Sequence, residues 1–177
     1  VIRLASAGEL TLPAMVVSAL RVAGAATEDE VEGGILADHL SKINDERKII
    51  VAHMMKEVKK TLSKREDKKI IVIGNPSWRI GVLGIIASKI VEEYKRPVFV
   101  WGSDGGNELK GSCRSWGGTN LVEIMTALPE NALSGFGGHA GAGGFSVSHE
   151  EIHFLEERIL KVYGEDREVE ENAAKDG

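Results

Sequence analysis

The chain has 177 residues, enough for one compact domain or two small ones, and its 42% hydrophobic and 28% charged residues are typical of a folded protein rather than a disordered one. No apolar run approaches the ~20 residues that span a membrane, and the net charge of −5 excludes a uniformly basic nucleic-acid-binding protein while leaving room for a local basic patch. The single cysteine, Cys113, excludes an internal disulfide and a multi-cysteine zinc site and favours a reducing, cytoplasmic setting. Because the sequence begins at Val1 rather than at methionine, we expect a fragment of a longer protein.

Hydrophobic spacing predicts helices that alternate with strands. A short helix is expected at 11–23 and a long one at 30–63, where apolar residues recur every three, four or seven positions. A buried strand, a helix and a second strand then form a β-loop-α-β unit, which is typical of a parallel sheet with ligands at the carboxyl ends of its strands. These three elements are expected at 70–73, 81–94 and 97–101, and they are followed by strands at 108–115 and 142–148 and by helices at 121–128 and 149–162. The prediction is an α/β fold with a mixed, mostly parallel sheet flanked by helices and preceded by a long linker helix.

Polar residues gather at the end of the predicted strand 108–115. Within Gly111–Ser115, Ser112 and Ser115 flank Arg114, and two glycines follow shortly after. A guanidinium offers a two-pronged donor to a phosphate, and serine hydroxyls add short hydrogen bonds. The alternative interpretation is a strand edge with an ordinary surface arginine. Cys113 alternates to the opposite face of the strand, where packing is expected rather than nucleophilic chemistry.

Glycine is concentrated in one half of the chain, since twelve of the 21 glycines fall between Gly102 and Gly144. The densest stretch, Phe136–Phe145, has five glycines in eight residues and includes His139. Such a segment exposes backbone N–H groups and lets a phosphate or another backbone come close, and its histidine can donate to a phosphate oxygen. A tight turn with an exposed histidine is the alternative, but the glycine density argues against an ordinary hairpin, so we predict a functional loop. The GxxxxGK[ST] pattern of a P-loop is missing.

A third motif, Trp78–Gly81, lies between the first predicted strand and the following helix. The N-terminus of a helix presents free N–H groups and positive potential to an anion, and Arg79 would add charge there. Alternatively, Trp78 closes the core while Arg79 extends along the surface. We include Arg79 among the candidate binding residues.

Taken together, four motifs resemble the C-terminal half of RecJ-type single-stranded-DNA exonucleases, which belong to the DHH phosphoesterase superfamily. The resemblance covers residues 68–162. Its motifs are Trp78–Lys89, Arg96–Val98, Gly111–Ser115 and Phe136–Gly143. It implies the end of a catalytic domain and a helical linker at 1–66, a DHH-associated substrate-binding α/β domain at 67–163, and an acidic flexible tail at 164–177.

In this superfamily the catalytic domain holds manganese (or magnesium) ions with Asp and His side chains, including an Asp-His-His motif. That motif does not occur in this sequence, so the resemblance implies a metal-dependent 5′–3′ exonuclease as the parent protein, with metal and catalytic residues outside this chain, which alone should be inactive. It assigns the phosphate or nearby backbone to Ser112, Arg114 and Ser115. It assigns contacts with the nucleotide next to the scissile bond to Gly137, Gly138 and His139.

The partners implied are single-stranded DNA and the catalytic DHH domain, with no membrane. Arg79 stands where bacterial members usually have histidine, which resembles an archaeal branch that includes a nuclease associated with the replication complex GINS, so GINS or another replication or repair protein is a further expected partner. Two alternatives stay open: an oligoribonuclease or cyclic-dinucleotide phosphodiesterase of the same superfamily, and a non-catalytic replication scaffold. Residues 101–146 carry two basic and four acidic side chains, so this segment alone is not expected to bind long single strands tightly.

Overall fold

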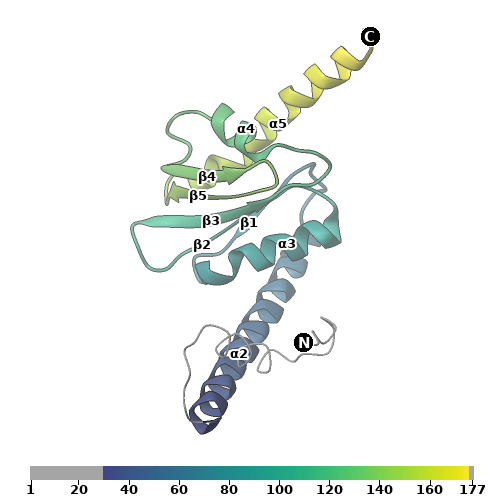
Figure 1. Ribbon diagram of the computed structural model, residues 1–177. Helices are drawn as coiled ribbons and strands as arrows, with labels where there is room; N and C mark the ends of the chain where they lie inside the picture. The colour runs from purple at the N-terminus through teal and green to yellow at the C-terminus, as the bar shows by residue number, and fades with distance from the viewer. Residues whose placement is uncertain (1–29, 176–177) are drawn as a thin grey trace. The chain divides into compact units, whose positions relative to one another are not determined.

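Five strands form one sheet with the order β1-β2-β3-β5-β4 (Figure 1). The computed structural model describes the backbone of residues 30–175 and the side chains of residues 36–164, so the predicted helix at 11–23 and the predicted end of a catalytic domain lie outside the described residues. The strands are β1 (Ile71–Gly74), β2 (Val98–Gly102), β3 (Glu108–Arg114), β4 (Gly135–His139) and β5 (Ala142–Ser148). The helices are α2 (Glu30–Leu62), the short 3-10 helix η1 (Ile80–Val82), α3 (Leu83–Tyr94), α4 (Leu121–Ala127) and α5 (Ile152–Lys175).

The predicted α/β class with a mixed sheet is confirmed, but the expectation of a mostly parallel sheet is wrong. Only β1 and β2 pair in parallel, joined by α3 as the crossover helix, whereas β2–β3, β3–β5 and β4–β5 are antiparallel. The reason lies in the connections. A parallel connection needs a crossover of a dozen or more residues, and the link 103–107 between β2 and β3 and the link 140–141 between β4 and β5 are long enough only for hairpin turns.

The two faces of the sheet carry different layers of the core. One face packs against α4 and α5, and α3 lies on the other face, where it contacts β2 and β3 (Figure 1). Because side chains alternate along a strand, Leu109 and Cys113 point into the α4–α5 core while Ser112 and Arg114 point to the α3 face. Every residue of β4 is exposed, so this edge of the sheet is left open.

The glycine-rich segment forms a β-hairpin, so the expectation that its glycine density excludes an ordinary hairpin is wrong, while its role in binding stays a prediction. Strand β4 pairs with β5 from Gly135↔Ser146 to His139↔Ala142, and the turn is Ala140–Gly141. Two of its glycines are needed by the fold itself. Gly138 has a φ of +146°, and a Cβ there would lie 2.4 Å from the Ala142 carbonyl oxygen; a Cβ on Gly143 would lie 2.9 Å from the Gly137 carbonyl oxygen.

The last helix is longer than predicted. It begins at Ile152, after Ser148 Oγ accepts a hydrogen bond from the Glu151 N–H, and its backbone continues to Lys175 instead of ending near 162. Gly164 does not stop it, because the residues that follow are mostly Glu, Ala, Lys and Arg, which favour helix. The described residues divide into two units between Ala52 and His53, and every feature discussed below belongs to the unit that begins at His53.

Candidate functional site

Arg114 and His139 lie in one row across three neighbouring strands. Ala142 of β5 pairs with Arg114 of β3 on one side and with His139 of β4 on the other. Residues directly opposite each other in an antiparallel pair project from the same face, so both side chains leave the sheet on the α3 side. Two strand spacings separate them, about 10 Å between Cα atoms.

A second row runs beside the first on the same face. Gly144 of β5 pairs with Ser112 on one side and with Gly137 on the other. We call these two rows the Arg114–His139 patch. It consists of Arg114, Ala142, His139, Ser112, Gly144 and Gly137.

The Arg114 guanidinium is held in place but not neutralised. Its Nη1 donates to Ser112 Oγ at 3.2 Å and to the Cys113 carbonyl oxygen at 2.8 Å. A Cβ on Gly84 would lie 3.1 Å from Nη2, so the guanidinium lies against the first turn of α3, where a larger residue would make a tight contact with it. Among the side chains of residues 36–164, no carboxylate lies within ion-pair distance of Arg114. A partly buried, fixed cation without a counter-ion is suited to an anionic ligand.

The two serines beside Arg114 do different things. Ser112 Oγ accepts the hydrogen bond from Arg114, so its own proton remains available to a ligand on the patch. Ser115 Oγ instead donates to the Thr119 carbonyl oxygen at 2.5 Å, and the Ser115 N–H donates to the Gly141 carbonyl oxygen at 3.0 Å. Of the two predicted serines, Ser112 is therefore placed to donate a hydrogen bond to an anion. Ser115 instead stabilises the loop between β3 and α4.

His139 is exposed and its tautomer is fixed by the turn. The Gly141 N–H donates to His139 Nδ1 at 3.2 Å, which leaves the proton of the neutral ring on Nε2. The turn itself is tied down, because the Leu121 N–H donates to the Ala140 carbonyl oxygen at 3.1 Å. His139 thus presents an N–H donor from an anchored hairpin.

Between Arg114 and His139 the patch consists mostly of backbone, because the residues there are alanine and glycine. A Cβ added to Gly137 would meet nothing within 4 Å, and one added to Gly144 would make only an ordinary contact of 3.5 Å with the Gly111 carbonyl oxygen. The fold does not require glycine at these two positions for space. They leave a flat backbone surface that a ligand can approach closely. Gly138, predicted to contact the ligand, is the one whose backbone conformation the hairpin itself demands.

Arg79 is not brought into this patch by strand pairing. It caps η1 after β1, whose last residue, Gly74, pairs with Trp101, whereas Arg114 pairs with Val98 at the opposite end of β2. Its side chain is exposed, and within the described residues no hydrogen bond joins it to Arg114.

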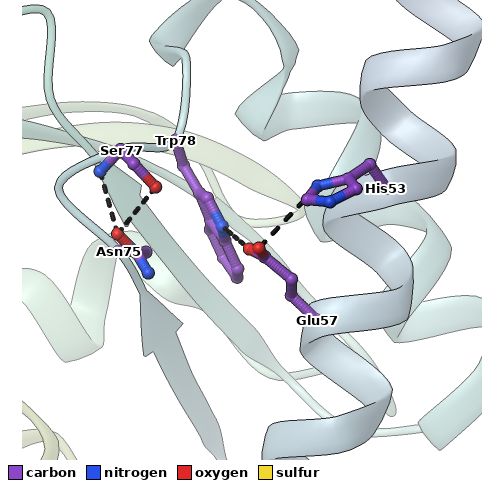
Figure 2. Close-up of polar contacts among 5 residues, drawn as sticks. All are labelled: His53, Glu57, Asn75, Ser77 and Trp78. Atoms are coloured by element: carbon purple, nitrogen blue, oxygen red, sulfur yellow. Dashed lines mark hydrogen bonds and ion pairs between the residues drawn. The ribbon is translucent and has the colours of Figure 1, made fainter.

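Its neighbour Trp78 closes the core, as the alternative interpretation expected. Trp78 is 4% exposed, and its indole Nε1 donates to Glu57 Oε2 of α2 at 2.7 Å, as Figure 2 shows. Asn75 holds the adjoining turn by accepting from the Ser77 N–H and hydroxyl (Figure 2). This end of β1 opens onto a groove of about 460 Å³ that Lys60, Lys64 and Arg65 border, but Arg79 is not among its lining residues.

Two residues near Arg114 in the sequence, Cys113 and Trp116, differ in exposure to solvent, and this difference limits what each can do. Cys113 is buried, as predicted, and burial raises the pKa of its thiol to about 11, so it is not a nucleophile at neutral pH. Trp116, which sequence reasoning did not single out, is 42% exposed only two residues after Arg114. The signal that could have found it is its place between the predicted phosphate-binding motif and two glycines.

Within the described residues, no group of three or more His, Cys, Asp or Glu side chains is arranged to hold a metal ion. None of the helices in that part of the chain is both long and apolar enough to cross a membrane.

Comparison with known proteins adds sequence relatives. A family model described as the DHHA1 domain matches residues 67–165. The single-stranded-DNA-specific exonuclease RecJ of Bacillus subtilis is 34% identical over 138 residues, which are 77% of this chain and 17% of that protein. RecJ of Escherichia coli is 33% identical over 136 residues, 72% of this chain and 24% of that protein. This chain therefore spans a quarter or less of the length of these relatives.

Solved structures agree with the sequence relatives. RecJ of Thermus thermophilus in complex with Mn²⁺ superposes with a TM-score of 0.67 at 28% identity, over 82% of this chain and 22% of that one. A second structure, exonuclease RecJ bound to manganese, gives a TM-score of 0.66 at 29% identity and covers 76% of this chain and 33% of that chain. The fold of the sheet and its helices is therefore one that these nucleases contain.

Proposed function

Because this chain belongs to the DHHA1 domain family, we propose that it is the nucleic-acid-binding part of a RecJ-like exonuclease and that its Arg114–His139 patch holds a phosphate of single-stranded DNA. The observation that carries the proposal is the fixed Arg114 guanidinium, which has a serine donor beside it and no carboxylate partner among the described side chains. An arginine so placed can give two parallel hydrogen bonds to a phosphate.

The residues of the patch would share the work of binding. Arg114 supplies the charge, the Ser112 hydroxyl adds one donor, and the His139 Nε2–H adds another from the far side of the row. Gly144 and Gly137 let the sugar-phosphate backbone lie on the sheet between them. Ser115 would act indirectly by keeping the loop after β3 in place.

Hydrolysis in the parent protein is expected to need a catalytic domain that is not part of this sequence. A divalent cation, Mn²⁺ or Mg²⁺, would lower the pKa of a bound water there, and the residues described here do not form a cluster to hold it. This chain's contribution would be to position the phosphate, which saves entropy at the reaction step. Digestion in the 5′–3′ direction and association with GINS or another replication protein are parts of the same proposal.

A direct test is the dependence of binding on the terminal phosphate. Fluorescence anisotropy with the 177-residue chain should show tighter binding of a 5′-phosphorylated single strand than of the same strand with a 5′-hydroxyl, and Arg114→Ala should abolish the difference. Lys161→Ala, which removes an exposed cation from α5, is the matched control and should keep it. Equal affinity of the wild-type chain for both strands would refute a terminal-phosphate site.

A second measurement separates the domain from the whole enzyme. Purified chain with added Mn²⁺ should not cleave single-stranded DNA, whereas the full-length protein should. Cleavage by the chain alone would contradict the assignment. For the full-length protein, preferential cleavage of di- to pentanucleotides would favour a small-substrate phosphodiesterase, and failure to cleave any of them would favour a scaffold.

A further inference from the structure

We propose that Trp116, supported by Lys95, is a stacking platform for a nucleobase of the strand whose phosphate lies on the Arg114–His139 patch. This inference rests on the proposed function and extends it from the phosphate to the base. It concerns a residue that no motif of the sequence analysis included.

The first observation is the exposure of a large aromatic side chain. Trp116 is 42% exposed, whereas Trp78 is 4% exposed in the core. An indole with this much of its surface in water offers apolar area that a stacked ligand would cover. An exposed tryptophan beside a cluster of phosphate-binding donors is the arrangement that single-stranded nucleic acid binding uses, since every base has a flat face that can stack.

The second observation is that Trp116 has a cation over its ring and hydrogen bonds that hold its backbone. Lys95 Nζ lies 4.6 Å from the centroid of the Trp116 ring. The Trp116 carbonyl oxygen accepts from Thr119 Oγ1 at 2.9 Å, and Ser115 Oγ bonds the Thr119 carbonyl oxygen in turn. The turn between them is completed by Gly117 and Gly118, both with positive φ. A preorganised platform loses little conformational entropy when a base stacks on it.

The third observation is location. Lys95 follows α3 and precedes Val98, which pairs with Arg114, so Lys95 and Trp116 lie at the same end of the sheet as the row of Arg114 and His139. The ammonium of Lys95 also adds positive charge there. The Arg114 guanidinium is turned toward Ser112 and Gly84, so a strand whose phosphate contacts it would extend from there to the aromatic surface and the second cation at this end of the sheet.

The test uses the 177-residue chain and its own fluorescence. Of its three tryptophans, Trp116 is the exposed one and Trp78 and Trp101 are buried or partly buried. Titration with a short 5′-phosphorylated oligothymidylate should quench the tryptophan emission. The same oligonucleotide with abasic sugars should quench it much less and bind more weakly.

Substitutions then assign the effect to the ring. Trp116→Ala should weaken oligothymidylate binding roughly 5- to 100-fold and remove the preference over the abasic strand. Trp116→Phe should lose the quenching but keep most of the affinity, because phenylalanine can still stack. Lys95→Gln should weaken binding less than Trp116→Ala does. Circular dichroism and thermal midpoints check that each variant is folded.

The outcomes separate the inference from the proposed function. If Trp116→Ala binds like wild type while Arg114→Ala binds weakly, the platform is wrong and the phosphate site stands. If Trp116→Ala weakens only the base-containing strand while Arg114→Ala has no effect, the platform stands and the phosphate site is wrong. If the wild-type chain binds neither oligonucleotide, both are refuted.

Discussion

Arg114 of β3 and His139 of β4 both pair with a single residue, Ala142, of the strand β5 that lies between them. They come from segments 25 positions apart in the sequence, and the antiparallel register alone brings them to the same face and the same end of the sheet. The guanidinium and the imidazole N–H therefore flank a surface that consists mostly of backbone. The following predictions test what that surface does and what supports it.

Arg114→Ala should weaken binding of a 5′-phosphorylated oligonucleotide by roughly 1.5–3 kcal/mol, the usual contribution of a hydrogen bond to a charged group. Arg114→Lys should recover only part of this, because lysine keeps the charge but not the two-pronged geometry. Lys161→Ala removes an equal charge from α5 and should have a smaller effect. Anisotropy titrations at one fixed salt concentration measure all three, and equal losses for Lys161→Ala and Arg114→Ala would contradict the assignment of the patch.

Two glycines of the hairpin should respond oppositely to alanine. Gly137→Ala places a methyl group in open space on the patch, so we expect an unfolding free energy close to that of the wild type and weaker oligonucleotide binding. Gly138→Ala forces a φ of +146° on alanine and a clash with the Ala142 carbonyl, so it should destabilise the fold by roughly 1–3 kcal/mol. Urea denaturation and binding assays on both variants would reveal the contrast. Unimpaired binding by Gly137→Ala would mean that no ligand approaches that backbone.

Glu57 should stabilise the second unit through the indole of Trp78. Glu57→Ala leaves a buried N–H donor without its acceptor and should lower the unfolding free energy by about 1–3 kcal/mol. Glu57→Gln keeps an amide oxygen as acceptor and should cost less. Glu130→Ala, at an exposed position, is the control. Denaturation curves in which Glu57→Ala matches Glu130→Ala would show that this hydrogen bond contributes nothing.

The buried thiol of Cys113 should make stability depend on pH in the alkaline range. Its pKa is about 11 in the folded chain against 9.0 for a free thiol, because burial disfavours the thiolate. The unfolded chain therefore releases the proton first, and the unfolding free energy falls as pH rises through the interval between these values. Cys113→Ala should lack this part of the decline. Parallel slopes for the two proteins in that interval would argue against a buried, protonated thiol.

Local patterns in the sequence predicted most of the elements. The β-loop-α-β unit, the strands at β3 and β5 and the burial of Cys113 follow from short-range periodicity and from turn and cap residues, and the structure confirms them. The resemblance to the DHH-associated domain of RecJ-type exonucleases is confirmed by the family model and the relatives. The antiparallel pairing of β2 and β3 could also have been inferred, since the few residues between the strands predicted at 97–101 and 108–115 are too short for a crossover.

The identities of the residues thus determined the helices, most of the strands and the three kinds of donor, arginine, serine and histidine, that the candidate site contains. The tertiary structure alone decided that β4 joins the sheet, that Arg114 and His139 share a row, and that Ser112 rather than Ser115 has a free hydroxyl. The physical reason is that strand register and side-chain hydrogen bonding depend on residues far apart in the chain. Short-range patterns carry no information about which of those residues meet.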